Sequence, residues 1–285
     1  MSAKLVETII VIVYVILCLG VGVYYSSRAL KSEEEYWVAS RFLGENTGAF
    51  AVFAVVGSAS TVIGITGLAY QLGLPFTAAV CAGFTLQFPL IAYLTAKPLR
   101  DMNICTLGDY FKERIGGVPV QLAYAIMSVI FLSAYVVPQL KASAMLGQWL
   151  IGGSYEISVI VIGFAFLFYS SIGGMWAVTI TDIIQGGMMM IGALLMAFIA
   201  LGKFGGLTSL IQQSLAARPQ LANLGMPVIS VIGLSFTWCL WGLIAPATVM
   251  RILTMKNSAS ARRSLALGSV FAAVSVGCTA IIIAM

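Results

Sequence analysis

The sequence predicts an all-α protein that crosses a membrane about eight times. Of its 285 residues, 60% are hydrophobic and 9% are charged, and the mean hydropathy is +1.02. Soluble domains carry about 25% charged residues, so lipid is expected to cover much of this surface. The apolar residues form long runs, and a run of about 20 can span a bilayer as a helix. The short alternating pattern of membrane strands is not seen.

Eight apolar runs are the candidate spans. Each is expected to be a helix, because backbone groups in lipid must find hydrogen-bond partners within the protein. The runs are residues 5–25, 47–71, 75–96, 118–149, 157–172, 178–201, 227–250 and 263–285. In the connection 203–227, leucine and isoleucine recur at roughly helical spacing, which predicts a short helix on the membrane surface.

The basic residues predict the orientation of the spans. Three of the fifteen lie in the connections on one side, namely Lys4, Lys203 and Arg218, and Lys141 lies within a span. The other eleven are Arg28, Lys31, Arg41, Lys97, Arg100, Lys112, Arg114, Arg251, Lys256, Arg262 and Arg263. Cytoplasmic connections are enriched in lysine and arginine, so the N-terminus is expected outside a plasma membrane, such as a bacterial inner membrane.

The remaining composition argues against several classes of function. The sequence has no histidine, and its five cysteines form no CxxC pair. Catalytic triads and most zinc sites are therefore not expected, and neither is an enzyme. No basic face interleaved with aromatic residues is present, so nucleic acid is not an expected partner. The expected partners are the lipid bilayer and a small-molecule substrate, and the oligomeric state stays open.

Two spans are predicted to be interrupted. Small and hydroxyl residues crowd the middle of the second span, over residues 57–67. The seventh span carries Gly242 and Pro246 in its second half. Such breaks free backbone carbonyls at membrane depth, where they are tolerated if they line a cavity. Interrupted helices at matching places in two halves indicate a transporter site, although small residues also allow close helix packing.

Five stretches, in this order, carry a resemblance to a known family. They are residues 35–41 (EYWVASR), 63–73 (IGxxGxxYxxG), 106–114 (TLGDYFxxR), 173–185 (GGxxAVxxTDxxQ), and the set Trp238, Gly242, Pro246 and Arg251. Each is weak alone, but five between the right spans are specific. The chain resembles the sodium/solute symporter family from about residue 33 onward.

The resemblance implies the inverted-repeat fold of the leucine transporter. Residues 1–285 would form a single transmembrane symporter domain. In it, 5–25 is an extra helix, 47–201 the first five-helix repeat, and 227–285 the first two helices of the second repeat. The ninth helix of the family does not occur, so the chain is expected to be a C-terminally truncated member.

The function implied is sodium-coupled secondary active uptake of a small organic solute, with Na⁺ as the coupling ion. The seventh span is most similar to the carboxylate and proline branch of the family, which includes pantothenate and acetate carriers, so a monocarboxylate is the favoured solute. Two alternatives stay open: a solute-sensing membrane module of a signalling protein, or an inactive fragment.

The resemblance also suggests a sodium site. It places the backbone carbonyls of Ala54 and Gly57 at the ion, although both could be ordinary helix carbonyls. Asp182 is the one acid near the inner end of an apolar span, where an acid is costly and indicates function. A second interpretation is that Thr181 and Asp182 cap the start of a helix.

The candidate substrate-binding residues lie on three spans. Ser58, Ser60 and Thr61 follow the first break, where their hydroxyls could face solute or bond back to the preceding turn. In the fourth span, Gln139 precedes Lys141, whose ammonium could hold a carboxylate or extend to the membrane interface. The others are two aromatic side chains at the second break, which could contact solute or pack in the core. They are Trp238 and Trp241.

Overall fold

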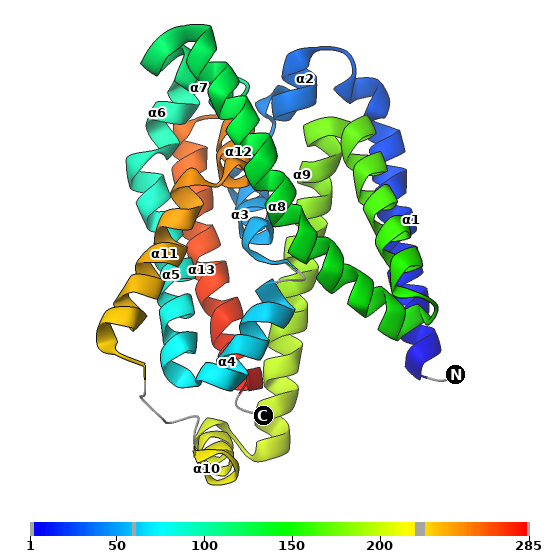
Figure 1. Cartoon of the computed structure of the whole chain (residues 1–285), viewed down its shortest axis with the longest axis vertical. Helices are drawn as coiled ribbons and strands as arrows, with labels where there is room; N and C mark the ends of the chain where they lie inside the picture. The colour runs from blue at the N-terminus through cyan, green and yellow to red at the C-terminus, as the bar shows by residue number, and fades with distance from the viewer. Residues whose placement is uncertain (1–2, 59–60, 220–225, 284–285) are drawn as a thin grey trace. The chain divides into compact units, whose positions relative to one another are not determined.

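The computed structural model describes residues 3–58, 61–219 and 226–283 (Figure 1). These residues form helices, with no β-strand among them, which confirms the predicted all-α class. The chain divides into two compact units, Met1–Phe42 with Met102–Asp182, and Leu43–Asp101 with Ile183–Met285. We call them unit 1 and unit 2.

Unit 1 is built around three long helices. Thr8 of α1 donates a hydrogen bond to the carbonyl of Leu150 on α8 (3.0 Å). A Cβ at Gly22 would lie 2.8 Å from the Cα of Tyr169 on α9, so α1 and α9 touch through their backbones. The helices are α1 (Ala3–Ala29), α2 (Glu33–Val38), a 3-10 turn (Ala39–Arg41), α7 (Leu107–Phe111), a π turn (Lys112–Gly116), α8 (Gly117–Ile151) and α9 (Tyr155–Phe204) up to Asp182.

A tryptophan on α9 anchors α2 to its neighbours. Trp176 is 4% exposed and stacks on Tyr25 and Phe42. Its indole N–H donates to Glu35 (2.7 Å), and the guanidinium of Arg28 lies 3.9 Å from its ring centre. Through its contacts with Glu35, Arg28 and the two aromatic rings, Trp176 joins α1, α2 and α9 within unit 1.

The contacts of Glu35 make the stability of unit 1 depend on pH. Partial burial raises the pKa of Glu35, but hydrogen bonds from Ser40 and Trp176 and the charges of Arg28 and Lys31 outweigh it and hold the pKa below 4.5. Folding therefore favours the carboxylate. The resulting stability is fully present above pH 4.5 and is lost as the pH falls through the lowered pKa.

Glu35→Gln should remove this pH dependence. We expect the variant to lose about 1–2 kcal/mol at pH 7, because a hydrogen bond to a charged acceptor becomes a neutral one. Thermal unfolding in detergent between pH 3 and 7 measures the loss. Glu33→Gln, on the exposed side of the same helix, is the matched control. An unchanged slope in Glu35→Gln would contradict the assignment.

Helix α9 changes direction at a glycine. Gly174 has φ 52° and ψ −150°, and a Cβ there would lie 2.9 Å from the carbonyl oxygen of Tyr36. Only glycine adopts this backbone readily. The spans predicted at 157–172 and 178–201 therefore lie on the two sides of the break at Gly174.

Gly174→Ala should destabilise unit 1 by about 2 kcal/mol or more, because it combines a strained backbone with a backbone clash. The melting temperature in detergent measures the effect. Gly192→Ala is the control, since nothing lies within 4 Å of a Cβ at that position of the same helix. Equal melting temperatures for the two variants would contradict the prediction.

Unit 2 is organised around α5, which packs against both α11 and α13, and α13 also packs against α3. A Cβ at Gly83 of α5 would lie 2.8 Å from the carbonyl oxygen of Ser235 on α11. The helices are α3 (Glu45–Val56), a π turn (Thr61–Ile65), α4 (Thr66–Leu72), α5 (Leu74–Leu94), α6 (Ala96–Asp101), the remainder of α9, α10 (Leu207–Ala217), α11 (Val228–Ile244), α12 (Pro246–Thr254) and α13 (Ser258–Ile283).

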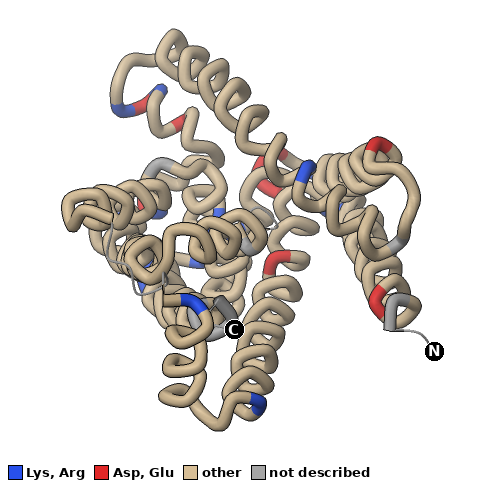
Figure 2. Tube along the Cα trace, turned by 60° about the horizontal axis from the view of Figure 1, so that its bottom comes forward, with Lys and Arg blue, Asp and Glu red and all other residues tan. Residues whose placement is uncertain are grey.

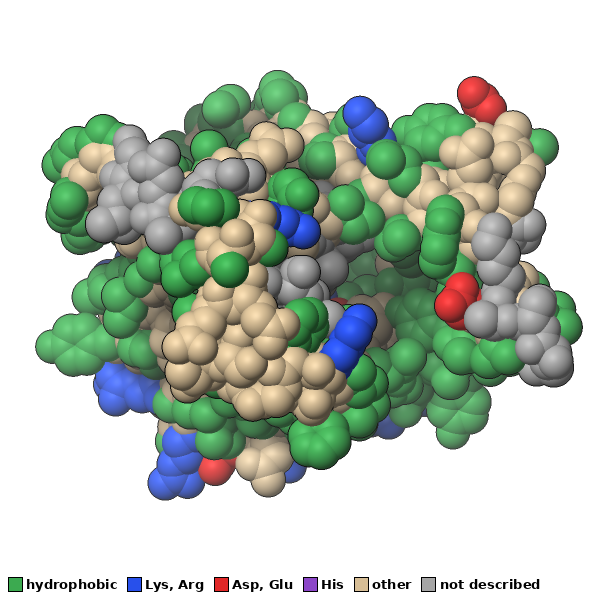
Figure 3. All heavy atoms as spheres, turned by 90° about the horizontal axis from the view of Figure 1, so that it is seen from below, with side chains coloured by type: hydrophobic (Ala, Val, Ile, Leu, Met, Phe, Trp, Pro, Cys, Tyr) green, Lys and Arg blue, Asp and Glu red, His purple; other side chains and the backbone are tan. Residues whose placement is uncertain are grey.

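The surfaces of the helices suit a membrane. Figure 2 shows long uncharged stretches, and Figure 3 shows many hydrophobic and few charged side chains on one face. Among the described residues, four helices are long and apolar enough to span a bilayer, or five if α11 and α12 form one bent span. The chain is a polytopic membrane protein, and the count of eight spans stays a prediction. The short helix predicted after residue 203 is present as α10.

Candidate functional site

The first predicted interruption is present in unit 2. Helix α3 ends at Val56, Gly57 is extended (φ −81°, ψ 113°), and helical structure resumes at Thr61 as a π turn. The last four carbonyls of a helix have no partner within it, so the carbonyl of Ala54 belongs to this free set. The sequence of glycine and hydroxyl residues thus produces two half-helices with backbone oxygen available between them.

Ser58 caps the second half-helix. Its hydroxyl accepts from the backbone N–H of Thr61 (3.1 Å) and lies 2.7 Å from the Thr61 hydroxyl. This is the geometry by which serine stabilises a helix start. Ser58 thus bonds forward, to the restarting helix. Ser60 lies outside the described residues.

A cavity of about 80 Å³ adjoins this interruption. A water molecule takes about 30 Å³ of liquid volume, so the space suits an ion or a few waters better than an organic solute. Its polar lining includes Gly57 and the hydroxyl residues Thr61, Ser275 and Thr279. The rest is hydrophobic: Phe53, Val56, Ile65, Val80, Phe84, Met189, Ala272 and Val276.

Sequence reasoning missed the residues that α9 and α13 bring to the cavity. Ser275 and Thr279 are one helical turn apart on α13, and the Thr279 hydroxyl donates to the carbonyl of Ser275 (2.9 Å). Met189 of α9 packs directly against Gly57. The pair of hydroxyl residues at i and i+4 in an apolar span was the signal that could have identified the α13 side of the site.

The second predicted interruption separates α11 from α12. Ala245 is extended (φ −67°, ψ 115°), Pro246 begins α12, and the two helices are bent by 45°. Trp238 lies before this break, is partly buried, and packs on Phe84 beside the cavity with ring centres 4.8 Å apart. Trp241 is partly buried on the same helix.

The remaining candidates lie in unit 1. Lys141 is exposed on α8 and Gln139 is partly buried, whereas Asp182 is 8% exposed on α9. Thr181 donates to the carbonyls of Ala177 and Val178 (2.9 Å each). Both Thr181 and Asp182 follow the break at Gly174 by about two helical turns, so the interpretation as a helix cap is wrong.

Of the predicted site residues, the structure brings Gly57, Ser58 and Thr61 together in unit 2.

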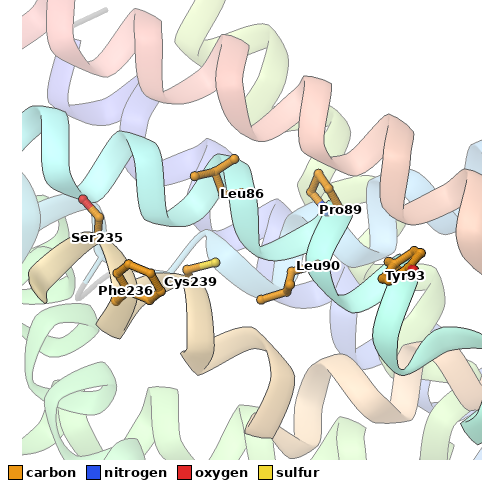
Figure 4. Close-up of a pocket in the computed structure, with 7 residues that line it drawn as sticks. All are labelled: Leu86, Pro89, Leu90, Tyr93, Ser235, Phe236 and Cys239. Atoms are coloured by element: carbon orange, nitrogen blue, oxygen red, sulfur yellow. The ribbon is translucent and has the colours of Figure 1, made fainter. Parts of the chain in front are cut away.

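A larger hollow lies between α5 and α11 (Figure 4). It has a volume of about 480 Å³ and an almost wholly apolar lining. The hydroxyl of Ser235 at its edge already donates to the carbonyl of Val231 (2.9 Å). The hollow therefore suits hydrocarbon better than a polar solute. The walls are Leu86, Pro89, Leu90, Tyr93, Ser235, Phe236 and Cys239.

Comparison with known proteins agrees with this architecture. A solved structure, described as the substrate-bound outward-open state of a Na⁺-coupled sialic acid symporter, superimposes with a TM-score of 0.79 at 22% identity. The match covers 95% of this chain and 58% of that symporter, so the two share a fold and this chain spans little more than half of its length. The fold is that of a membrane transporter.

The family assignment follows from the sequence itself. The model of the sodium:solute symporter family matches residues 36–285. The chain belongs to this family, which confirms the assignment made from the five motifs.

Proposed function

We propose that this chain functions in sodium-coupled secondary active uptake of a small organic solute across the plasma membrane. The observation that carries the proposal is the interruption of α3 at Gly57 beside a small cavity with hydroxyl groups in its wall. Membership of the sodium:solute symporter family and the fold shared with a Na⁺-coupled symporter support the same function.

The ends of the two half-helices favour opposite charges. The C-terminus of α3 carries partial negative charge and free carbonyls, which favour a cation. We assign Na⁺ to this end, with the carbonyls of Ala54 and Gly57 as backbone ligands and the Thr61 hydroxyl as a further oxygen. Asp182, buried on α9, is proposed to act on the path of the ion.

The proposed solute is a monocarboxylate. The helix that resumes at Thr61 begins with partial positive charge, which favours an anionic group. Lys141 offers an ammonium on α8, and the sialic acid carried by the similar symporter is itself an acid. Ser58, Gln139 and Trp241 are the polar and aromatic groups proposed to contact the rest of the solute. Ser60 and Trp238 complete the proposed set.

Uptake into proteoliposomes tests this function. We expect labelled short monocarboxylates to accumulate when a sodium gradient points inward and to stay at the empty-liposome level when potassium replaces sodium. Neutral amides of the same acids are the matched solutes for the carboxylate requirement. Equal uptake in sodium and potassium would overturn the coupling, and equal uptake of acid and amide would overturn the substrate class.

A further inference from the structure

The N-terminal end of α3 and the C-terminal end of α12 are joined by backbone hydrogen bonds. In each helix, the interruption lies at the opposite end. The N–H of Leu43 donates to the carbonyl of Thr254 (3.2 Å), and the N–H of Lys256 donates to the carbonyl of Leu43 (3.0 Å). Leu43 and Met255 thus form a parallel bridge, and both are fully buried. Leu43, which precedes α3, is therefore hydrogen-bonded to Thr254, the last residue of α12.

Arg100 closes this junction from α6. Its Nε donates to the carbonyl of Met255 (2.6 Å), and its Nη2 donates to the carbonyl of Lys256 (2.9 Å). Arg100 is 8% exposed, so its charge is largely removed from solvent. A guanidinium at a helix C-terminus satisfies free carbonyls and opposes the negative end of the helix dipole.

Helix α13 adds a further contact to the same point. The Ser264 hydroxyl donates to the carbonyl of Glu45 in the first turn of α3 (2.9 Å). A Cβ at Gly48 would lie 2.7 Å from the Sδ of Met255, so α3 approaches Met255 as closely as a glycine allows. We call Leu43, Arg100, Met255, Lys256 and Ser264 the α3–α12 clamp.

We propose that the α3–α12 clamp keeps these two half-helices together throughout the transport cycle, with Arg100 as its positioning residue. This inference rests on the proposed function. Separating α3 from α12 would leave the buried carbonyls of Thr254 and Leu43 and the N–H groups that they accept from without partners, which is costly. Arg100 holds the carbonyls of Met255 and Lys256 from α6 and so positions the residues that pair with Leu43. Movement during transport is instead taken up at Gly57 and Ala245, where the backbone is already extended.

A disulfide across the bridge tests the proposal directly. Bridge partners lie at a separation that suits a disulfide, so Leu43→Cys with Met255→Cys should cross-link on oxidation. The background carries alanine in place of the five native cysteines. We expect sodium-driven uptake by the cross-linked protein to stay within about twofold of the reduced protein, because the joined halves need not part. Loss of uptake that a reductant restores would overturn the clamp.

Hydrogen exchange tests the clamp independently of transport. Arg100→Gln should raise exchange at the amides of Leu43 and Lys256 about tenfold or more, because charged hydrogen bonds are lost. Arg100→Lys should give a smaller rise, since lysine retains the charge without the fork of donors. Arg262→Gln, an exposed arginine on α13, is the control of equal charge. Unchanged exchange in Arg100→Gln would overturn the clamp, whereas absence of uptake by the wild type would overturn only the proposed function.

Discussion

Gly186→Val should strongly destabilise unit 2. A Cβ at Gly186 of α9 would lie 2.6 Å from the carbonyl oxygen of Phe50 and 3.2 Å from its carbonyl carbon, both on α3. Backbone atoms in the middle of a helix cannot give way as the end of a side chain can. We expect a loss of about 3 kcal/mol, the upper end of overpacking effects, and a sharp fall in the yield of monodisperse protein.

Gly187→Val is the matched control for this substitution. It places the same β-branched residue one position along the same helix, where nothing lies within 4 Å of a Cβ. Thermal unfolding and size-exclusion profiles of the two variants should separate the steric effect from the lower helix propensity of valine. Similar profiles would show that α3 and α9 are not in backbone contact at Gly186.

Thr61→Val should weaken the sodium dependence of uptake. Valine keeps the shape of threonine but removes the hydroxyl that lines the cavity and contacts Ser58. Loss of one oxygen ligand to a cation is expected to raise the sodium concentration for half-maximal uptake about tenfold or more, while the melting temperature changes little. Thr61→Ser restores the oxygen and should return most of the affinity.

One result would contradict the assignment of Thr61 to the ion site. A lower maximal rate with unchanged sodium dependence in Thr61→Val would place the hydroxyl outside the ion site. It would leave Thr61 as a partner of Ser58 in capping the helix. Uptake across a sodium series, at a fixed saturating solute concentration, distinguishes these cases.

The broken helices could be predicted because their causes are local. Gly57, Ser58 and Pro246 each weaken or end a helix locally, and their clustering with other small residues favoured an interruption at these places. Gly173 and Gly174 were predicted to lie between two spans, and the helical backbone is interrupted at Gly174. The close approach of Tyr36 to Gly174 could not be predicted in this way, because it depends on where α2 lies and not on the sequence of α9.

The cavity wall could not be predicted in the same way. Ser275 and Thr279 lie more than 200 residues from Gly57 in the sequence, and only packing of α13 against α3 brings them near it. Glu35 was part of one motif and Trp176 lies within the range of another, but their hydrogen bond depends on how α2 folds back within unit 1. Contacts of this kind arise from tertiary structure, which periodicity does not encode.

Positions where glycine allows two helices to touch should tolerate substitution much less than exposed apolar positions do. At Gly22, Gly83 and Gly186 even a methyl group would meet backbone atoms of a neighbouring helix, so substitution of these glycines is disfavoured. The outward side chains of α8, such as Val129 at 67% exposure, meet no such barrier and can exchange with other apolar residues. We therefore expect the sequence to change slowly at the close contacts between helices and rapidly on the surfaces that face lipid.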